Sequence, residues 1–392
     1  MASRVSRSPR VILVTAAYFP DSYGGAERQA TILAQALGRQ GVDVTLVAPT
    51  VSADAPLAEA TGFGRILRKR VRAYPNLGGR NILSFLAWSL WMPRAFRSTH
   101  WRGVPVYVFH ARLHTLAAVL TAMRLGSSLF VKLGGGGEAS EFDALRRKKF
   151  FYGRWVASLL RRRVAMFVAN SVPIAAELRS LGVEDARIAE FPNGVELPSA
   201  EFHAAAERRR TGSRFIYMAR MLPDKNVDVL YHAAMTAAKG GALLKLALIG
   251  DGPEKQRLEA IEPDGQAQET VRFTGFLDDV YPELSAADFF VSASRREGQS
   301  NALLEAMSAG VIPVVYAASG VEEVVTDGEN GLIVHECSAM AFSAAMNRAL
   351  ALTDDERRQM SRNARTFAEA HIGIDAIAER TRHLMGISKK FG

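Results

Sequence analysis

The feature that most constrains this chain is a regular alternation between short apolar runs and helix-length segments. The first run, VILVTAAYF at 11–19, is followed by a loop, a helical pattern from about Gly25 to Arg39 and a second run at 42–49. Near-continuous Val, Ile and Phe runs joined by helices are typical of a parallel sheet covered on both faces. Further strands are predicted in this half at 104–111, 128–133, 166–171 and 188–192, and helices at 82–98, 112–125, 141–163 and 173–181.

The same pattern then starts again. A second set of strands is predicted at 215–220, 244–250, 271–276, 289–294, 311–317 and 331–335, and residues 353–388 have a helical pattern without a further strand. A chain of 392 residues is long enough for two or three domains. We therefore predict an α/β protein with two doubly wound, Rossmann-like domains that face a central cleft. The expected parts are a first domain at 1–195, a second at 196–370, a C-terminal helix at 371–392 that packs back on the first domain, and a linker at 193–212.

The cysteine content and the hydropathy pattern indicate a cytoplasmic protein. Cys337 is the only cysteine, so the chain has no internal disulfide and no metal site built on cysteines. The basic N-terminus leads directly into a strand-like run, without the apolar core and cleavage site of a secretory signal. The most apolar stretch, 82–92, ends at Pro93 and Arg94 after about 11 residues, whereas a membrane span needs about 20.

Charge is distributed unevenly along the chain. The net charge is +9, yet residues 1–195 contain 27 Lys and Arg against 12 Asp and Glu, and residues 196–392 contain 22 against 28. A basic half joined to an acidic half suggests that the two domains meet different partners.

The strongest local signal is the segment REGQSNALLEAMSAG at 296–310, which follows a predicted strand. Ser300 is a good N-cap for a helix from Asn301 to Ala309, and this helix is apolar nearly all round, which predicts that it is buried. Its one carboxylate, Glu305, needs donors such as ribose hydroxyl groups. The backbone N–H groups of Gly298, Gln299, Ser300 and Asn301 lie at a helix N-terminus and suit an anion such as a phosphate.

In this setting, Glu297 and Glu305 are separated by seven residues. The pattern resembles the E-x7-E motif of the retaining, GT-B-fold glycosyltransferases of family 4, the group 1 glycosyltransferases. The resemblance covers nearly the whole chain. Three further segments resemble family landmarks: PDSYGGAERQ with Gly24 and Gly25, FIYMARMLPDK with Arg220 and Lys225, and LALIGDGPE.

The resemblance implies transfer of a sugar from a nucleotide-sugar donor, with retention at the anomeric carbon. In this interpretation Glu297 contacts the donor sugar, Glu305 holds the ribose, and Arg220 and Lys225 hold the diphosphate. An arginine fork and a lysine point charge both suit a diphosphate. Gly24 and Gly25 allow the backbone to approach the donor closely. The chain contains no Asp-x-Asp, so we expect no metal and no cofactor, with cations and helix dipoles offsetting the charge of the leaving group.

One departure from the family pattern concerns a histidine. The family often has one after the fifth N-terminal strand, where this chain has Gly134 within FVKLGGGGE. His110, which follows the strand at 104–109, is the nearest substitute, and Glu138 is a further candidate. A histidine at a strand end can equally be structural. The GGGG run lacks the G-x-G-x-x-G spacing of a dinucleotide fingerprint.

The basic half also contains segments that mix cations with aromatic residues. These segments are 65–72, 85–96 with Trp88 and Trp91, and 146–163 with Trp155. Such segments suit an anionic membrane surface, although a solvated basic face over core aromatics is the alternative. We therefore expect a peripheral protein on the inner face of the plasma membrane. Nucleic acid is not expected as a partner, because no nucleic-acid-binding module is recognisable.

The partners expected from the sequence are a nucleotide-sugar donor, with a UDP-sugar as the first guess, and a lipid-linked or polysaccharide acceptor. Two alternatives remain open at this point. One is a sugar-nucleotide epimerase or a phosphorylase on a similar scaffold. The other is a non-catalytic carbohydrate- or membrane-binding protein, which the missing histidine at position 134 makes conceivable. Turnover of a nucleotide sugar distinguishes the enzymes from the binding protein.

Overall fold

The structure is a computed structural model that describes residues 8–75, 81–135, 140–147, 152–261, 269–295, 299–318 and 320–387. These residues form two compact units. The first unit extends to Gly194 and includes the C-terminal segment from Ile374, and the second unit is Val195–Gly373. Each unit is a helix-covered sheet that is almost entirely parallel. The predicted α/β fold with two doubly wound sheets is therefore confirmed.

The sheet of the first unit has the strand order β3-β4-β2-β1-β5-β6-β7-β8. Its strands are parallel except for β3, which pairs antiparallel with β4 at the edge. The strands are β1 (Arg10–Val14), β2 (Asp43–Thr50), β3 (Ala58–Thr61), β4 (Gly64–Arg70), β5 (Val106–Phe109), β6 (Leu129–Leu133), β7 (Met166–Ala169) and β8 (Ile188–Glu190). The helices are α1 (Gly25–Arg39), α2 (Ile82–Ala95), α3 (Thr115–Leu125), α4 (Glu141–Arg146), α5 (Tyr152–Arg163), α6 (Val172–Ser180) and α14 (Ile374–Leu384).

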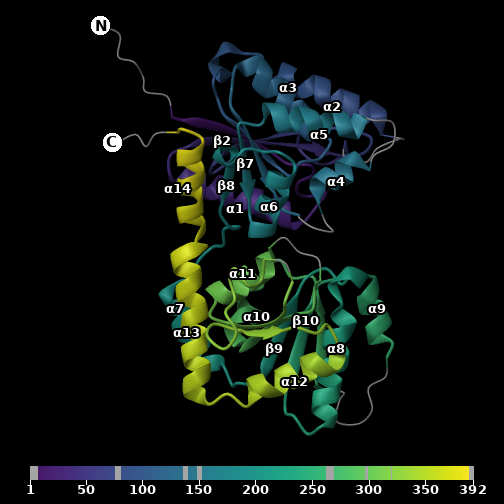
Figure 1. The fold of residues 1–392 in the computed structure, drawn as a ribbon, viewed down its shortest axis with the longest axis vertical. Coiled ribbons are helices and arrows are strands. Elements are labelled where there is room, and N and C mark those ends of the chain that lie inside the picture. Colours follow the sequence, from purple (N-terminus) through teal and green to yellow (C-terminus); the bar gives the residue numbers. More distant parts are fainter. Residues whose placement is uncertain are drawn as a thin grey trace. The chain divides into compact units, whose positions relative to one another are not determined.

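Successive residues of each central strand contribute to two separate cores. In β1, Ile12 and Val14 join a core built with α2 to α6, whereas Val11 and Leu13 join a core built with α1 and α14. Side chains alternate between the faces of a strand, so both faces of this sheet are buried. Figure 1 shows α2, α3 and α5 together in this unit.

The C-terminal helix α14 belongs to the first unit and packs against α1. Its Ile374 and Ile377 are buried in the same core as Leu33 and Leu37 of α1. At the surface, the guanidinium of Arg39 donates to Asp375 at 2.9 Å. Exposed pairs of this kind contribute little, so the apolar contact accounts for most of the stabilisation.

The second unit has the strand order β11-β10-β9-β12-β13-β14, with every pair parallel. Its strands are β9 (Arg214–Met218), β10 (Lys245–Ile249), β11 (Val271–Gly275), β12 (Phe289–Ser292), β13 (Ile312–Tyr316) and β14 (Leu332–Val334). Its helices are α7 (Ala200–Arg209), α8 (Val227–Lys239), α9 (Pro253–Glu259), α10 (Tyr281–Ala286), α11 (Asn301–Ser308), α12 (Ala339–Leu350) and α13 (Asp354–His371).

Both faces of the second sheet are also covered. Phe215 and Tyr217 of β9 pack in a core with α8 and α12, and Ile216 and Met218 pack in a core with α10, α11 and α13. Figure 1 shows α8 and α12 near one another, and β9 and β10 beside them. The apolar run predicted at 215–220 thus forms a central strand because both of its faces are buried.

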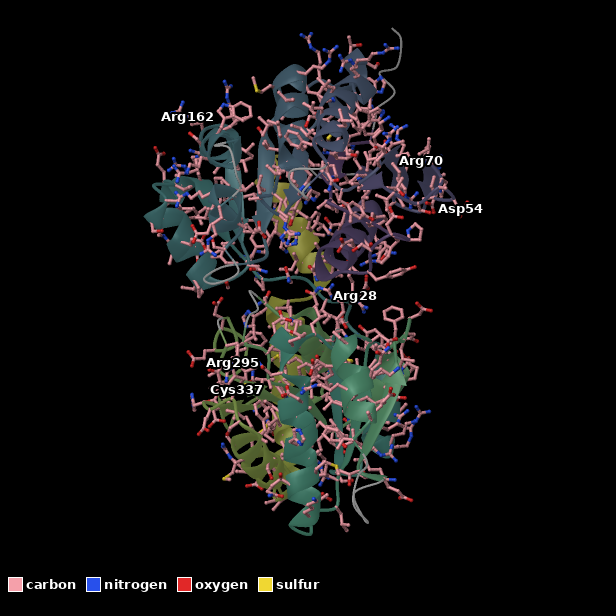
Figure 2. All side chains as sticks on the ribbon, turned by 90° about the vertical axis from the view of Figure 1, so that its right-hand side faces the viewer. Arg28, Asp54, Arg70, Arg162, Arg295 and Cys337 are labelled. Carbon is pink, nitrogen blue, oxygen red and sulfur yellow. The ribbon has the colours of Figure 1, made fainter. Side chains whose placement is uncertain are left out.

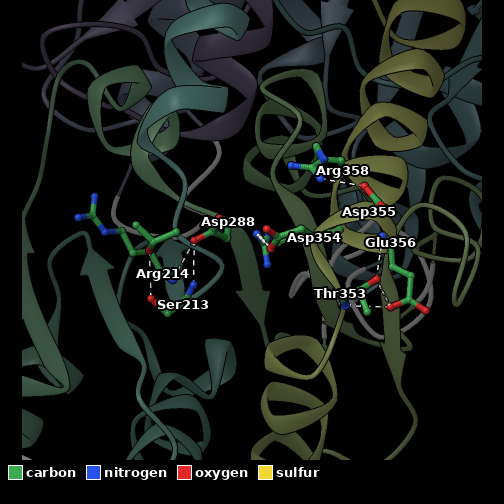
Figure 3. A network of polar contacts seen from close by, with 10 residues as sticks. Ser213, Arg214, Asp288, Thr353, Asp354, Asp355, Glu356 and Arg358 are labelled. Atoms are coloured by element: carbon green, nitrogen blue, oxygen red, sulfur yellow. Dashed lines mark hydrogen bonds and ion pairs between the residues drawn. The ribbon is translucent and has the colours of Figure 1, made fainter.

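Two polar features hold the ends of elements in the second unit (Figure 3). The carboxylate of Asp288 accepts hydrogen bonds from the backbone N–H groups of Ser213 and Arg214, both at 3.0 Å, at the start of β9. Helix α13 begins with a capping box in which Thr353 and Glu356 satisfy each other's backbone N–H groups. Such a box satisfies two N–H groups that a helix start otherwise leaves without partners.

Two predicted connections differ from the structure. Helix α7 occupies most of the second half of the linker predicted at 193–212, because Ser199 caps a run of good helix formers that buries His203 and Ala206. The basic segment at 65–72 is largely strand β4, and its Arg68 is buried. The Arg68 guanidinium donates to Glu59 at 2.8 Å and to the Phe19 carbonyl at 3.1 Å. This segment therefore pairs within the sheet, and its Arg68 is occupied by partners inside the first unit instead of facing a membrane.

The aromatic residues of α2 also differ from the membrane-facing role expected for them. Trp88 is fully buried and donates its indole N–H to the His114 carbonyl at 3.0 Å. Trp91 is half-buried and stacks on Trp88 with ring centroids 5.8 Å apart. Both rings therefore belong to the core side of α2. None of the helices that the structure describes is both long and apolar enough to cross a bilayer.

We predict that Trp88→Ala lowers the free energy of unfolding by about 3–5 kcal/mol, because it empties a fully buried site. Trp155→Ala is the matched control: this side chain on α5 is 57% exposed, so its loss should change stability by less than about 0.5 kcal/mol. Urea denaturation followed by circular dichroism measures both. Equal effects of the two substitutions would contradict the placement of α2.

Candidate functional site

The candidate site in the second unit lies at the switch point of its sheet. The strand order places β9, the first strand, beside β12, the fourth, so the chain builds the sheet outward in opposite directions from this pair. The loops that leave the two strands diverge, and ligands of doubly wound sheets bind at the carboxyl ends of strands at such a point. Arg220 and Lys225 follow β9, and residues 299–305 follow β12. The structure thus brings these predicted residues to one edge, whereas Glu297 and Gly298 lie outside the described residues.

Lys225 connects the two loops at this switch point. Its half-buried ammonium group lies 3.4 Å from the hydroxyl oxygen of Ser294, which follows β12. The next residue, Asn226, adopts a left-handed backbone conformation with φ 48° and donates its side-chain amide to the Ala293 carbonyl at 2.9 Å. Asparagine tolerates this conformation better than most residues. The turn therefore directs Lys225 toward the end of β12.

Arg220 stands on a loop that is held by backbone contacts with the loop after β10. The N–H of Met221 donates to the Asp251 carbonyl at 2.8 Å. Gly250 has φ 131°, and a Cβ there would lie 2.0 Å from the Ala219 carbonyl oxygen. No side chain fits that space, so the glycine allows the two loops to meet. The Arg220 side chain itself is exposed.

Helix α11 places Glu305 in a buried position. The helix begins at Asn301, and the Ser300 hydroxyl caps it by accepting from the Leu303 N–H, as the sequence predicted. Leu303, Leu304, Ala306 and Met307 lie in a core of the second unit, and Glu305 is only 9% exposed. A carboxylate in such surroundings requires partners that bind its charge.

The opposite end of α11 is held by Arg210. Its guanidinium donates to the carbonyl oxygens of Ala309 at 2.6 Å and Gly310 at 2.8 Å, which lie just beyond the helix. Burial lowers the pKa of Arg210 to about 10, so it remains a cation at neutral pH. A cation at a helix C-terminus is favourable. With Ser300 at one end and Arg210 at the other, α11 is fixed in place, and Glu305 with it.

A pocket opens beside the start of α11. Its lining combines hydroxyl and amide groups with apolar side chains, and includes Ser292, Ser294, Gln299, Ser300, Tyr316 and Gly320. Ser294 is buried, and Tyr316 is half-buried at the end of β13. Gln299 and Ser300 were predicted from the sequence as site residues, whereas Ser294, Tyr316 and Gly320 were not. The signal that identifies Ser294 is its place at the carboxyl end of the strand predicted at 289–294.

Predicted site residues of the first unit lie at the switch point of its own sheet. Strand β1 pairs with β5 there, and Gly24 and Gly25 follow β1 whereas His110 follows β5. Gly24 is the N-cap of α1, and a Cβ at this position would lie 2.4 Å from the Glu27 carboxylate. The two glycines thus form the start of a helix at the carboxyl edge of the sheet.

His110 has a carboxylate partner that was not predicted from the sequence. Its Nδ1 is hydrogen-bonded to Glu141, the first residue of α4. Glu138, the candidate named from the sequence, lies outside the described residues. Burial by itself raises the pKa of Glu141, but His110 and the backbone N–H groups of Ala111 and Gly134 outweigh it, so that the pKa is lowered. Glu141 is therefore ionised at neutral pH.

The described residues contain no cluster of three or more His, Cys, Asp and Glu side chains arranged to hold a metal ion.

Cys337 is half-buried, and its backbone carbonyl accepts a hydrogen bond from the guanidinium of Arg295 at 3.4 Å (Figure 2).

Two protein-family models match consecutive parts of the chain. Residues 23–199 match the model described as "Glycosyltransferase Family 4", and residues 199–367 match the model described as "Glycosyl transferases group 1". The boundary between the matches lies close to the boundary between the two units.

A curated relative with a related sequence is the "Lipopolysaccharide core biosynthesis glycosyltransferase LpsE" of Rhizobium meliloti. It is 29% identical over 191 residues, which cover 48% of this chain and 55% of the relative. The chain spans about half the length of the curated relatives it matches.

Solved structures resemble the fold over nearly the whole chain. A sucrose-phosphate synthase from Thermosynechococcus elongatus has a TM-score of 0.74 and 20% identity, with coverage of 97% of this chain and 100% of that one. Anabaena HepE in complex with UDP and glucose has a TM-score of 0.71 and 16% identity, with coverage of 96% and 99%. At these identities the likeness concerns the fold alone.

Proposed function

Because this chain belongs to the group 1 glycosyltransferases of the GT-B fold, we propose that it transfers a sugar from a nucleotide-sugar donor to a lipid-linked or polysaccharide acceptor, with retention at the anomeric carbon. One observation carries the proposal. At the switch point of the second unit, Lys225, the start of α11 and the buried carboxylate of Glu305 are held at one edge of the sheet. This set matches the chemistry of a nucleoside diphosphate.

The diphosphate of the donor is bound by cations and by the start of a helix. Lys225 supplies a point charge and Arg220 a planar fork that can bind two oxygens. The backbone N–H groups of Gln299, Ser300 and Asn301 add donors at the N-terminus of α11, where the helix dipole favours negative charge. Glu305 accepts hydrogen bonds from the ribose hydroxyl groups.

In the reaction, the bond between the anomeric carbon and a donor phosphate oxygen breaks. The acceptor oxygen bonds to the same face of that carbon, and its proton passes to the leaving phosphate, so no nucleophile from the enzyme is needed. Glu297 contacts the hydroxyl groups of the donor sugar and stabilises the positive charge that develops on the ring. Arg220 and Lys225 stabilise the negative charge of the departing diphosphate, which makes a divalent metal unnecessary.

The nature of the donor and acceptor is supported by the similar proteins. The HepE structure was determined with UDP and glucose, which favours a UDP-sugar as the donor. The LpsE relative acts in lipopolysaccharide core biosynthesis according to its name, which favours a lipid-linked glycan as the acceptor.

A surface of the first unit suits the membrane in which such an acceptor is found. Helix α2 exposes Ile82, Leu83, Leu86 and Leu90, which are 46–68% exposed, and the exposed Arg94 and Arg97 follow them. We call these six residues the α2 surface. Residues 1–195 contain 27 Lys and Arg against 12 Asp and Glu, and Arg70 and Arg162 project from this unit (Figure 2). An apolar stripe beside cations is complementary to an anionic membrane, so the protein is peripheral on the inner face of the plasma membrane.

A thermal-shift screen of nucleotide sugars tests the donor site. At 100 times its dissociation constant a true donor adds about 2.7 kcal/mol of stability. Glu305→Gln should largely abolish the shift for this donor, because it removes a charged acceptor whose hydrogen bonds contribute about 1.5–3 kcal/mol. Glu336→Gln, on an exposed residue, is the control. A folded Glu305→Gln variant with full donor affinity would overturn the ribose assignment, and absence of turnover with every donor would favour a non-catalytic protein.

Arg220→Ala and Lys225→Ala are each expected to reduce kcat by about 100-fold or more, since loss of charge stabilisation at a transition state costs roughly 2.7–4 kcal/mol. Lys245→Ala, at the amino end of β10, should leave turnover unchanged. Initial rates measure the effect of each substitution. The same assay of the wild type with and without EDTA tests whether the reaction needs a metal. Activity that disappears with EDTA and returns with magnesium would contradict the metal-free mechanism.

Membrane docking is tested by co-sedimentation with liposomes. Leu83→Glu with Leu86→Glu should abolish binding to anionic liposomes, because each change removes an apolar contact and adds a repelled charge. Leu243→Glu in the second unit, where the leucine is 88% exposed, is the matched control. Each cation near an anionic surface contributes about 1 kcal/mol to binding. Salt screens this attraction, so high salt should weaken wild-type binding. Equal binding of the double variant and the control would exclude the α2 surface.

A further inference from the structure

We propose that Lys132 and Asn170 form a subsite of the first unit that binds an anionic group of the acceptor, either a phosphate or the carboxylate of an acidic sugar. The ammonium of Lys132 pairs with the anionic oxygens, and the side-chain carbonyl of Asn170 accepts a hydrogen bond from a neighbouring hydroxyl group of the same ligand. The inference rests on the proposed glycosyl transfer and adds to it the chemical class of the acceptor. Four observations on the described residues carry it.

The first observation is a lysine in the middle of a buried sheet. Strand β6, with the sequence LFVKL, is buried along its whole length. Lys132 is only 6% exposed, and it pairs with Phe109 of β5 on one side and Val168 of β7 on the other. Strands in this position normally consist of apolar residues. Residues that break such a local rule are expected at functional sites.

The second observation is the lack of a partner for the charge. No hydrogen bond or ion pair joins the Lys132 ammonium to another residue in the part of the chain that the structure describes, and burial by itself lowers its pKa to about 7. A buried charge without a partner is costly. An anionic ligand removes this cost, because it favours the charged form of the lysine and supplies the missing acceptor.

Another buried cation of the same unit shows the contrast. Arg68 is also 6% exposed. Its guanidinium donates to Glu59 at 2.8 Å and to the carbonyl oxygens of Pro56 at 3.0 Å and Phe19 at 3.1 Å. A cation that serves the fold is thus surrounded by acceptors, whereas Lys132 is not.

The third observation is the place of Lys132 in its strand. It is the last residue but one of β6, and a lysine buries its stem while keeping its charged head toward water. The ammonium is therefore directed toward the carboxyl edge of the sheet, where ligands of doubly wound sheets bind. The proposed function assigns the donor diphosphate to the second unit, so an anion at this edge of the first unit belongs to the acceptor.

The fourth observation is a second polar group on the same face. Val168 pairs with Lys132, and Asn170 lies two residues further along, just beyond β7. Side chains alternate along a strand, so both polar residues share the face on which Val168 packs with α1 and α14. From the strand spacing and the rise per residue, the Cα atoms of Lys132 and Asn170 are about 8 Å apart.

Asn170 has an acceptor atom to offer. It is 3% exposed, and among the described residues its Oδ1 has no hydrogen-bond partner. Its Nδ2 donates to Asn193 at 3.5 Å, and Gln29 of α1 holds the next residue, Gly194, at its carbonyl oxygen at 2.8 Å and at its N–H at 3.1 Å. One ligand with an anionic oxygen and a hydroxyl group therefore satisfies both Lys132 and Asn170.

Lys132→Met tests the missing partner. Methionine is of similar length and has no charge, so without ligand this variant should raise Tm by about 2–4 °C. Lys245→Met, on an exposed lysine at the start of β10, is the matched control and should leave Tm unchanged. A lower Tm, or failure of Lys132→Met to fold, shows that the ammonium has a structural partner and overturns the inference.

Anion binding is measured by isothermal titration calorimetry with glucose 6-phosphate, glucuronate and neutral glucose. The background is Arg220→Ala with Lys225→Ala, which removes the cations of the second unit. In this background Lys132→Met should weaken binding of an anionic probe by about 10-fold or more, as for the loss of a charge-assisted hydrogen bond. Lys245→Met should not.

The two anionic probes distinguish the possible acceptor groups. Tighter binding of glucose 6-phosphate identifies a phosphate, and tighter binding of glucuronate identifies a carboxylate. Binding of neither anion contradicts the inference, and so does equal binding with and without Lys132→Met.

Asn170→Asp supplies an anion from the chain itself. The new carboxylate pairs with the ammonium of Lys132, so this variant should have a higher Tm than the wild type and bind the anionic probes about 10-fold or more weakly. Asn170→Ala should weaken binding of glucose 6-phosphate but not of inorganic phosphate, which has no sugar hydroxyl group. If Asn170→Asp changes neither stability nor anion binding, the two side chains do not share a site.

These results separate the inference from the proposed function. If the wild type binds a nucleotide sugar and no anion binding depends on Lys132, the inference is wrong and the donor assignment stands. If anions bind through Lys132 but no nucleotide sugar binds or turns over, the proposed function fails, and the role of Lys132 in an acceptor site fails with it.

Discussion

In a parallel sheet covered by helices on both faces, the side chains along the strands face apolar cores. Polar side chains therefore gather in the loops at the carboxyl ends of the strands. In residues 11–14 of β1 and 215–218 of β9 each side chain enters one of two apolar cores, so polar side chains are confined to the ends of these strands. The loops at the carboxyl ends of the strands lie outside these cores, so their side chains can be polar. Where the strand order reverses, these loops separate and leave room for a ligand. Both candidate sites of this protein lie at such a reversal, between β1 and β5 and between β9 and β12.

Within the second unit, backbone geometry rather than side-chain bulk brings the site together. Gly250 lets the loop after β10 lie against the loop that carries Arg220, and the left-handed Asn226 turns Lys225 toward Ser294. Helix α11 is held at both ends, which fixes the buried Glu305. A rigid arrangement of this kind suits electrostatic stabilisation, since groups that are already oriented need not reorganise when charge develops.

In the first unit, two histidines close together in the sequence, His110 and His114, have different surroundings. His114 is buried and neutral and supports the fold through the Phe109 carbonyl, whereas His110 has an ionised carboxylate partner and an accessible ring. The difference arises from the groups that pack against each ring, and not from its neighbours in the sequence. The glycine at 134 is part of the same arrangement, because its missing side chain leaves the space that the His110 ring fills.

The sequence by itself determined the doubly wound architecture, since buried parallel strands must be continuous apolar runs and the chain shows two sets of them. It also determined the N-cap at Ser300 and the burial of α11, because both depend on local chemistry and helical periodicity. Three features could be decided only by the tertiary structure. Trp88 faces the core rather than the membrane, the segment at 65–72 pairs as a strand beside β2, and Glu141 meets His110 from 31 residues away. Each depends on which distant segments pack together, and the burial of a side chain or the partner of a charge is set by that packing and not by the residues next to it in the chain.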